Sequence, residues 1–264
     1  MGKEMFAIML VSFLASIIGS ICGIGGGIII KPVLDSLSIF TLSTINFLSG
    51  CTVLAMAFFN VVGFFTRKEN NIELKSSFLL AIGGIIGGFL GKYIFEVFQK
   101  IFVNPSYGSA IQSFILLIIN LGSLIYTINK GKIKTLKVTS ILIIIAIGCG
   151  LGFLSAFLGI GGGPINIVIL HFFFSMLSKQ AAQNSLFIIF FSQATSLIQT
   201  VITKSMPNVS LPILFEMMVC GIAGAFVGKI INKKIAENIV NKLFIVTMIL
   251  LILLNIYNFI IFIN

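Results

Sequence analysis

Long apolar stretches, separated by short polar connectors, make up most of this chain. A helix that crosses the hydrocarbon core of a bilayer needs about 20 predominantly apolar residues. Eight stretches are long enough, and they cover residues 5–30, 42–65, 76–99, 108–128, 138–174, 181–203, 211–231 and 239–263. The pattern predicts an all-α polytopic membrane protein with about eight transmembrane segments, of which the first and fifth carry an internal glycine break.

The composition narrows the class of protein. Of the 264 residues, 58% are hydrophobic and 9% are charged, whereas an average soluble domain is about 25% charged. So few charges could not cover a soluble surface, which argues against a nucleic-acid-binding domain, a secreted disulfide scaffold and a disordered tail. We expect a multi-pass protein of the cell membrane that contacts the lipid bilayer and no nucleic acid. A homo-oligomer is compatible with the sequence.

The net charge of +10 comes from 17 Lys and Arg residues against 7 Asp and Glu residues. In a membrane protein, an excess of basic residues indicates first how the chain is oriented in the membrane and that it contacts anionic lipid. If each of the eight segments crosses once, the basic residues divide nine to eight between the two sides. The most basic loop, residues 130–137, favours placing both termini in the cytoplasm.

The second half of the chain repeats features of the first at an offset of about 137 residues. The matches are Gly23-Ile24-Gly25-Gly26-Gly27 with Gly159-Ile160-Gly161-Gly162-Gly163, Asn46 with Asn184, and Gly84, Gly87, Gly91 and Lys92 with Gly221, Gly224, Gly228 and Lys229. They predict two transmembrane repeats, residues 1–130 and 138–264. Four crossings per repeat make the repeats parallel, which is the arrangement we favour, and they would be inverted if the first and fifth segments double back. The apolar start could pass for a signal peptide, but its glycine-rich end recurs in the second repeat, so we expect it to belong to the fold.

The two glycine runs are poor helix formers, because each Gly costs about 1 kcal/mol against Ala. They also free backbone N–H and C=O groups that lipid cannot satisfy, so such backbone must be buried in protein or line a polar cavity. Broken spans in matching positions of two halves point to a transporter's solute site. Exposed N–H groups would favour an anion. For the spaced glycines Gly84, Gly87 and Gly91 and their counterparts, close helix packing is the better interpretation.

The glycine runs and their flanks resemble those of a known family, the TauE/SafE sulfite exporter-like transporters, also called the sulfonate uptake permeases. The resemblance is carried by residues 19–27 with Pro32 downstream, and by residues 152–164, which end in Gly161-Gly162-Gly163-Pro164. It implies transport of small sulfur-containing anions such as sulfite, thiosulfate, sulfonates or sulfoacetate, without a cofactor. The second run has Pro164 directly after its glycines, whereas the first has Ile28 there, so the two halves of the site are not equivalent.

From these observations we expect a carrier that works by alternating access, with the solute held between the two glycine runs and one half moving against the other. Lys31 could bind the anion or extend to the interface from a span end. Asn46 and Asn184 would form a matched pair of amides, and Gln193 would extend this polar lining with neutral donors. The candidate substrate-binding residues are Gly25, Gly26, Gly27, Gly161, Gly162, Gly163, Pro164, Asn46, Asn184, Gln193 and Lys31.

Other polar residues give weaker signals. Glu216 lies inside an apolar segment and is the candidate for proton coupling. His171 is the single histidine, and the four cysteines have no metal-like spacing, so we expect no metal site and no enzyme. An intramembrane enzyme would require His171 and Glu216 to line one cavity within hydrogen-bond reach. A structural membrane subunit, in which the glycine runs serve only dry helix packing, is the other alternative.

Overall fold

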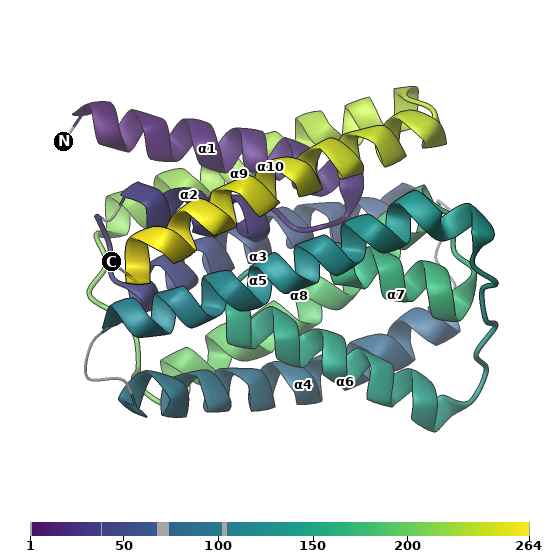
Figure 1. Ribbon diagram of the computed structural model, residues 1–264, viewed down its shortest axis with the longest axis horizontal. Coiled ribbons are helices and arrows are strands. Elements are labelled where there is room, and N and C mark those ends of the chain that lie inside the picture. The colour runs from purple at the N-terminus through teal and green to yellow at the C-terminus, as the bar shows by residue number, and fades with distance from the viewer. Residues whose placement is uncertain (1, 38, 68–73, 102–104, 264) are drawn as a thin grey trace.

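The computed structural model describes residues 2–37, 39–67, 74–101 and 105–263, and these residues form helices joined by short connectors (Figure 1). In chain order the helices are α1 (Gly2–Cys22), α2 (Gly27–Leu37), α3 (Leu42–Arg67), α4 (Leu74–Ile101), α5 (Pro105–Asn129), the short 3-10 helix η1 (Lys130–Lys132), α6 (Ile141–Leu158), α7 (Pro164–Phe174), α8 (Ser178–Ile202), α9 (Leu211–Lys234) and α10 (Glu237–Ile263).

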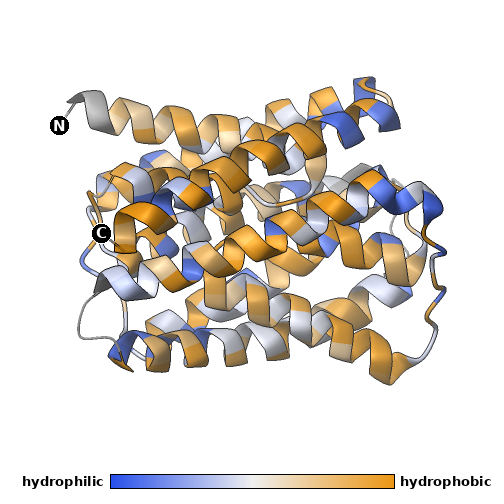
Figure 2. Ribbon diagram, viewed as in Figure 1, coloured by the Kyte–Doolittle hydropathy of each residue, from blue (hydrophilic) through white to orange (hydrophobic). Residues whose placement is uncertain are grey.

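Eight of these helices are long and apolar enough to cross a membrane, which confirms the predicted all-α polytopic architecture. Hydrophobic residues make up most of the length of the helices, and hydrophilic residues gather toward the two ends of the bundle (Figure 2). The remaining two α-helices, α2 and α7, have 11 residues each. At 1.5 Å per residue each reaches about half the thickness of the hydrocarbon core.

The two short helices double back. Both chain termini lie at one end of the bundle, which we call the terminal end, and the opposite end is the far end (Figure 1). Helix α1 starts at the terminal end, and α2 returns to it, where Asn258 of α10 donates to the carbonyl of Pro32. Helix α7 returns to the far end, where Leu136 N–H bonds the carbonyl of Phe172.

The second half therefore runs opposite to the first. Helix α1 begins at the terminal end and α6 begins at the far end (Figure 1). The expectation of parallel repeats is wrong, because it counted the segments at 5–30 and 138–174 as single crossings. Each is a hairpin of one long and one short helix, so each half crosses the membrane an odd number of times in total.

The spaced glycines join helices from different halves. A Cβ atom on Gly87 of α4 would strike the carbonyl of Cys149 in α6, and one on Gly228 of α9 would lie 2.6 Å from the carbonyl oxygen of Ile17 in α1. Such close backbone approach is what small residues permit in membrane helices, and it confirms the packing interpretation. We call these contacts the α4–α6 seam and the α1–α9 seam. Each seam joins a helix of one half to a helix of the other, so the halves interlock, with α3 and α8 between the seams.

Candidate functional site

The chain is non-helical at both glycine runs. Helix α1 ends at Cys22 and α2 begins at Gly27, while α6 ends at Leu158 and α7 begins at Pro164. Gly25 has a φ of +72° and Gly162 a φ of +125°, backbone conformations that glycine adopts without the strain of a Cβ atom. Both runs are buried in the protein, as the absence of water in a bilayer core requires for irregular backbone.

The two runs lie against each other. A Cβ atom on Gly25 would be 3.2 Å from the carbonyl oxygen of Gly161, and one on Gly27 would strike the carbonyl oxygen of Ile160. On the other side, a Cβ atom on Gly163 would lie 3.3 Å from Cδ1 of Ile28. The glycines therefore allow two irregular segments from opposite halves to cross with their backbones in contact.

Two helix N-termini meet at this crossing. Helix α2 starts at Gly27 and helix α7 at Pro164, and each runs away from the crossing toward a different end of the bundle. The first N–H groups of a helix have no intrahelical acceptor, and the helix dipole places partial positive charge there. The crossing thus receives the positive ends of two half-length helices, an arrangement that favours an anion.

Four buried polar side chains face the runs. Nε2 of Gln193 lies 3.0 Å from the Cβ position of Gly161, Nδ2 of Asn166 lies 3.2 Å from that of Gly162, and Oγ of Ser16 lies 3.2 Å from that of Gly26. The side chain of Asn46 packs against Gly159. All four are nine-tenths buried or more, with Asn46 the most exposed at 9%.

These side chains retain unused hydrogen-bonding capacity. Within the described residues, Nε2 of Gln193, Oγ of Ser16, Oδ1 of Asn166 and both amide atoms of Asn46 have no hydrogen-bond partner. A buried polar group without a partner costs about 1–3 kcal/mol, so native proteins rarely keep several together without a reason. Aliphatic side chains, among them Val53 and Ile189, face the same runs, so the crossing is lined by both polar and apolar groups.

Lys31 is fully buried beside the second run. Its Nζ donates to Oε1 of Gln112 and, at 2.7 Å, to the carbonyl of Leu158, the last residue of α6. The alternative in which Lys31 extends to the membrane interface is therefore wrong. Asp35, one turn further along α2 and 3% exposed, attracts Lys31 electrostatically. Lys31 places a positive charge next to the site and fixes the end of α6.

The structure places Asn184 elsewhere. Its Oδ1 accepts a hydrogen bond from Ser77 of α4, and its Nδ2 donates to the carbonyl of Gln180. The residue that packs against Gly23, as Asn46 packs against Gly159, is Ala182. Asn46 and Asn184 therefore do not form the expected pair of amides at the runs. The structural counterpart of Asn46 is Ala182, at the offset of 136 residues that relates the two glycine runs, and Asn184 lies two residues further along.

Glu216 and His171 are not brought together. Glu216 is the sixth residue of α9, partly buried, with Oε2 unpartnered among the described residues. His171 in α7 bonds Tyr126, with 2.8 Å between Nδ1 and the phenol oxygen. No described hydrogen bond links the two, and the described residues contain no cluster of three or more His, Cys, Asp or Glu that could hold a metal. The described residues therefore give no support to the enzyme alternative.

Sequence reasoning missed three residues near the runs: Ser16, Asn166 and Asp35. Asn166 stands two residues after Pro164 in an otherwise apolar stretch, and Asp35 follows Lys31 at the helical spacing of four. An isolated amide or carboxylate inside an apolar segment is a functional signal, and both could have been found on that ground. Ser16 carries no such signal, since serine is common in membrane helices.

A membrane bundle whose two half-length helices begin at buried, mutually facing breaks is typical of multi-pass membrane transporters. Sequence comparison gives the family. The profile described as "Sulfite exporter TauE/SafE" matches residues 8–254, and the chain therefore belongs to the TauE/SafE family of membrane transporters.

Two relatives carry names of the same class. "Probable membrane transporter protein YunE" of Bacillus subtilis (strain 168) is 29% identical over 219 residues, which cover 75% of this chain and 79% of the relative. "Probable membrane transporter protein MJ0441" of Methanocaldococcus jannaschii is 29% identical over 168 residues, which cover 62% of this chain and 60% of the relative. No solved structure matches the chain.

Proposed function

We propose that this transporter carries a small sulfur-containing oxyanion, such as sulfite, thiosulfate, sulfoacetate or another sulfonate. The observation that carries the proposal is the crossing of the two glycine runs, where two helix N-termini and the unpaired groups of Asn46, Asn166 and Gln193 converge. The buried charge of Lys31 lies beside them. This set supplies hydrogen-bond donors and positive potential, which an oxyanion requires. The family description supports sulfite and related anions as the first candidates.

Transport proceeds by alternating access in this proposal. The runs are buried and in contact, so the solute reaches them only after the helices around the crossing separate toward one end or the other. The interlocked seams suggest which bodies move: α4 with α6, and α1 with α9, because backbone contacts hold each pair together. In this proposal the moving bodies are these two pairs of helices, each with one helix from either half, in place of the two sequence halves.

The test is uptake and counterflow in liposomes that contain the purified protein. Radiolabelled sulfite, thiosulfate and sulfoacetate would be compared with acetate, a small carboxylate that contains no sulfur. We expect saturable uptake and counterflow for at least one sulfur oxyanion and none for acetate. Protein-free liposomes and a Gly162→Val variant serve as controls. Equal rates for acetate, or no uptake of any sulfur oxyanion above the protein-free background, would overturn the proposal.

A further inference from the structure

Two adjoining pockets open at the far end of the bundle, beside the last turns of α9. Their volumes are about 200 and 30 Å³, and Lys229 and Lys233 line both of them. The larger pocket lies against Gly63 of α3, where a Cβ atom would meet Nζ of Lys229. The smaller one is large enough for a water molecule and is also lined by Gln183 and Asn232.

The smaller pocket leads to the first glycine run. Ser20 and Ala182 line it, and Ala182 is the residue that packs against Gly23. Asn232 donates to the carbonyl of Ile21, with 2.7 Å between the two atoms, and so ties the wall of the pocket to the last turn of α1. A solute in this pocket would be one residue layer away from the crossing.

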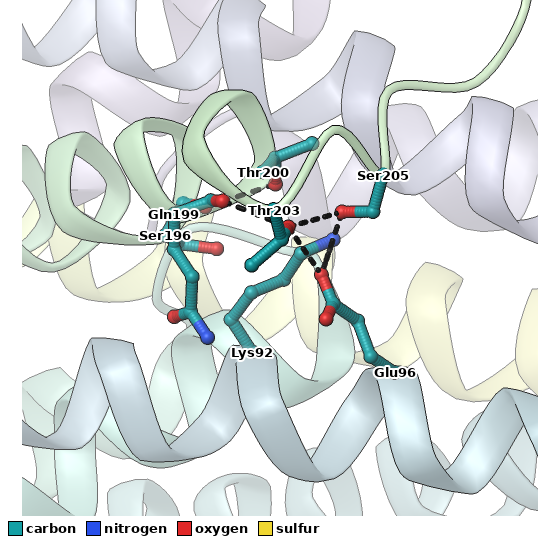
Figure 3. Close-up of polar contacts among 7 residues, drawn as sticks. All are labelled: Lys92, Glu96, Ser196, Gln199, Thr200, Thr203 and Ser205. Carbon is teal, nitrogen blue, oxygen red and sulfur yellow. Dashed lines mark hydrogen bonds and ion pairs between the residues drawn. The ribbon is translucent and has the colours of Figure 1, made fainter.

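The matching place at the terminal end is built differently. At the offset of the repeat, Lys229 corresponds to Lys92 and Lys233 corresponds to Glu96. Glu96 forms an ion pair with Lys92 at 3.7 Å and accepts hydrogen bonds from Ser205 at 2.6 Å and Thr203 at 3.3 Å (Figure 3). This network ties α4 to the connector after α8. The far end thus has a pocket with two lysines where the terminal end has an ion pair of one lysine and one glutamate, which we call the Lys92–Glu96 latch.

We propose that the pocket lined by Lys229, Lys233, Gln183 and Asn232 is a second anion site, the vestibule through which the solute reaches the first glycine run. The Lys92–Glu96 latch closes the opposite end of the same path. The proposal rests on the proposed transport of an oxyanion, and it adds the place where the anion is first held. Two lysines in a small pocket that is also lined by the amides of Asn60, Gln183 and Asn232 raise the local concentration of anions.

The test uses thiol chemistry, which reports on the vestibule whether or not any solute is transported. A cysteine is introduced by Gln183→Cys, and its reaction rates with an anionic and a cationic methanethiosulfonate are measured, after subtraction of labelling in the wild-type protein. The same ratio is then measured with Lys229→Gln and Lys233→Gln added. Lys242→Gln is the matched control, since Lys242 is exposed at the same end and does not line either pocket.

We expect the ratio of anionic to cationic rates to fall about 1.5- to 5-fold for each lysine removed, the range for a partly exposed charge. Lys233→Arg, which keeps the charge, should preserve the ratio, and Lys242→Gln should leave it unchanged. Sulfoacetate at millimolar concentration should slow the modification. A ratio that does not respond to loss of both lysines, or that responds equally to Lys242→Gln, would overturn the vestibule. If the lysines control the ratio but sulfoacetate gives no protection, the vestibule stands and the sulfur oxyanion is the claim that fails.

A separate observation, the distribution of charge along the bundle, orients the protein in the membrane. Fourteen lysines have described side chains, and Lys3, Arg67 and Lys68 lie outside that set. The helix directions place ten of the fourteen at the far end: Lys75, Lys130, Lys132, Lys134, Lys137, Lys179, Lys229, Lys233, Lys234 and Lys242. Lys92, Lys100, Lys204 and the buried Lys31 belong to the terminal half.

We infer that the far end faces the cytoplasm and that both termini lie outside, because cytoplasmic connectors carry the excess of basic residues. The sequence pointed the other way, with both termini in the cytoplasm. The sequence divided the basic residues almost evenly between the two sides because it treated the two glycine-broken segments as single crossings. That treatment placed the connectors between these segments on the wrong sides of the membrane.

C-terminal fusions test this orientation in bacterial cells. Alkaline phosphatase fused after Asn264 should be active and green fluorescent protein fused there should be dark, since the first matures only outside the cytoplasm and the second only within it. A Lys132→Cys variant should react with an impermeant maleimide in inside-out vesicles and not in intact cells. A bright fluorescent fusion with an inactive phosphatase fusion, or labelling of Lys132→Cys in intact cells, would reverse the inferred orientation.

Discussion

Replacing Gln193 by leucine distinguishes a residue that binds the solute from one that stabilises the fold. The two roles predict opposite signs for the change in the free energy of unfolding. Gln193 is 2% exposed, and its Nε2 has no partner among the described residues. Leucine has a similar volume and no polar atom, so Gln193→Leu removes a buried unsatisfied group that costs about 1–3 kcal/mol. The solute-free variant should therefore be at least as stable as the wild type toward unfolding.

Binding should change in the opposite direction. If Nε2 of Gln193 donates to the anion, the variant loses a hydrogen bond to a charged group, worth about 1.5–3 kcal/mol. At about 1.4 kcal/mol per factor of ten, affinity falls about 10- to 150-fold. The assays are calorimetric titration of the detergent-solubilised protein with thiosulfate and with sulfoacetate, and thermal unfolding without solute.

The matched control is Asn120→Leu in α5. Asn120 is also fully buried, and both of its amide atoms lack partners within the described residues, but it is not among the groups closest to either run. We expect Asn120→Leu to gain stability and keep its affinity. Affinity within about twofold of the wild type in Gln193→Leu, or an equal loss in Asn120→Leu, would refute the reasoning that the unpaired group at the crossing serves the solute.

Three further outcomes are expected. Gly162→Val should abolish uptake while the protein still inserts into the membrane, because φ is +125° there and a side chain is strained; Gly150→Val, with open space around it, should retain uptake. Lys31→Met should lower the free energy of unfolding by about 3–5 kcal/mol, since it leaves Asp35 buried without its charged neighbour, and unchanged thermal unfolding would contradict this. Asn184→Ala should leave thiosulfate affinity within about twofold of the wild type, because its amide bonds α4 and its own helix, so a tenfold loss would return it to the site.

The helices themselves were predictable because lipid imposes a simple rule. A segment in hydrocarbon must be apolar for about 20 residues and must satisfy its own backbone, and the eight long helices of the chain follow from that rule. The glycine runs were also predictable, since each places four glycines within five residues of an apolar stretch, at matching positions of the two halves. Gln193 and Asn46 followed as polar residues in segments where lipid would exclude them.

The direction of the chain after each run was not predictable in the same way. The residues that follow Gly27 and Gly163 are mostly apolar, like those that precede the runs, and hydrophobicity does not tell whether a helix continues or returns. Counting each broken segment as a single crossing reversed the expected direction of one half relative to the other. It also assigned basic connectors to the wrong side of the membrane. The pairing of Asn46 with Asn184 failed for a smaller reason, since a difference of two residues in register turns a helical side chain through more than half a turn.

The α1–α9 seam also has a consequence for how the protein is made. Helix α1 is synthesised before its seam partner α9, which begins only at Leu211, about 190 residues later. At about 5–20 residues per second, α1 waits about 10–40 s in the membrane before its partner is synthesised. During that interval the groove near Ile17 that receives Gly228 faces lipid or an assisting protein. Helix α1 is therefore inserted well before α9, the helix that completes its packing.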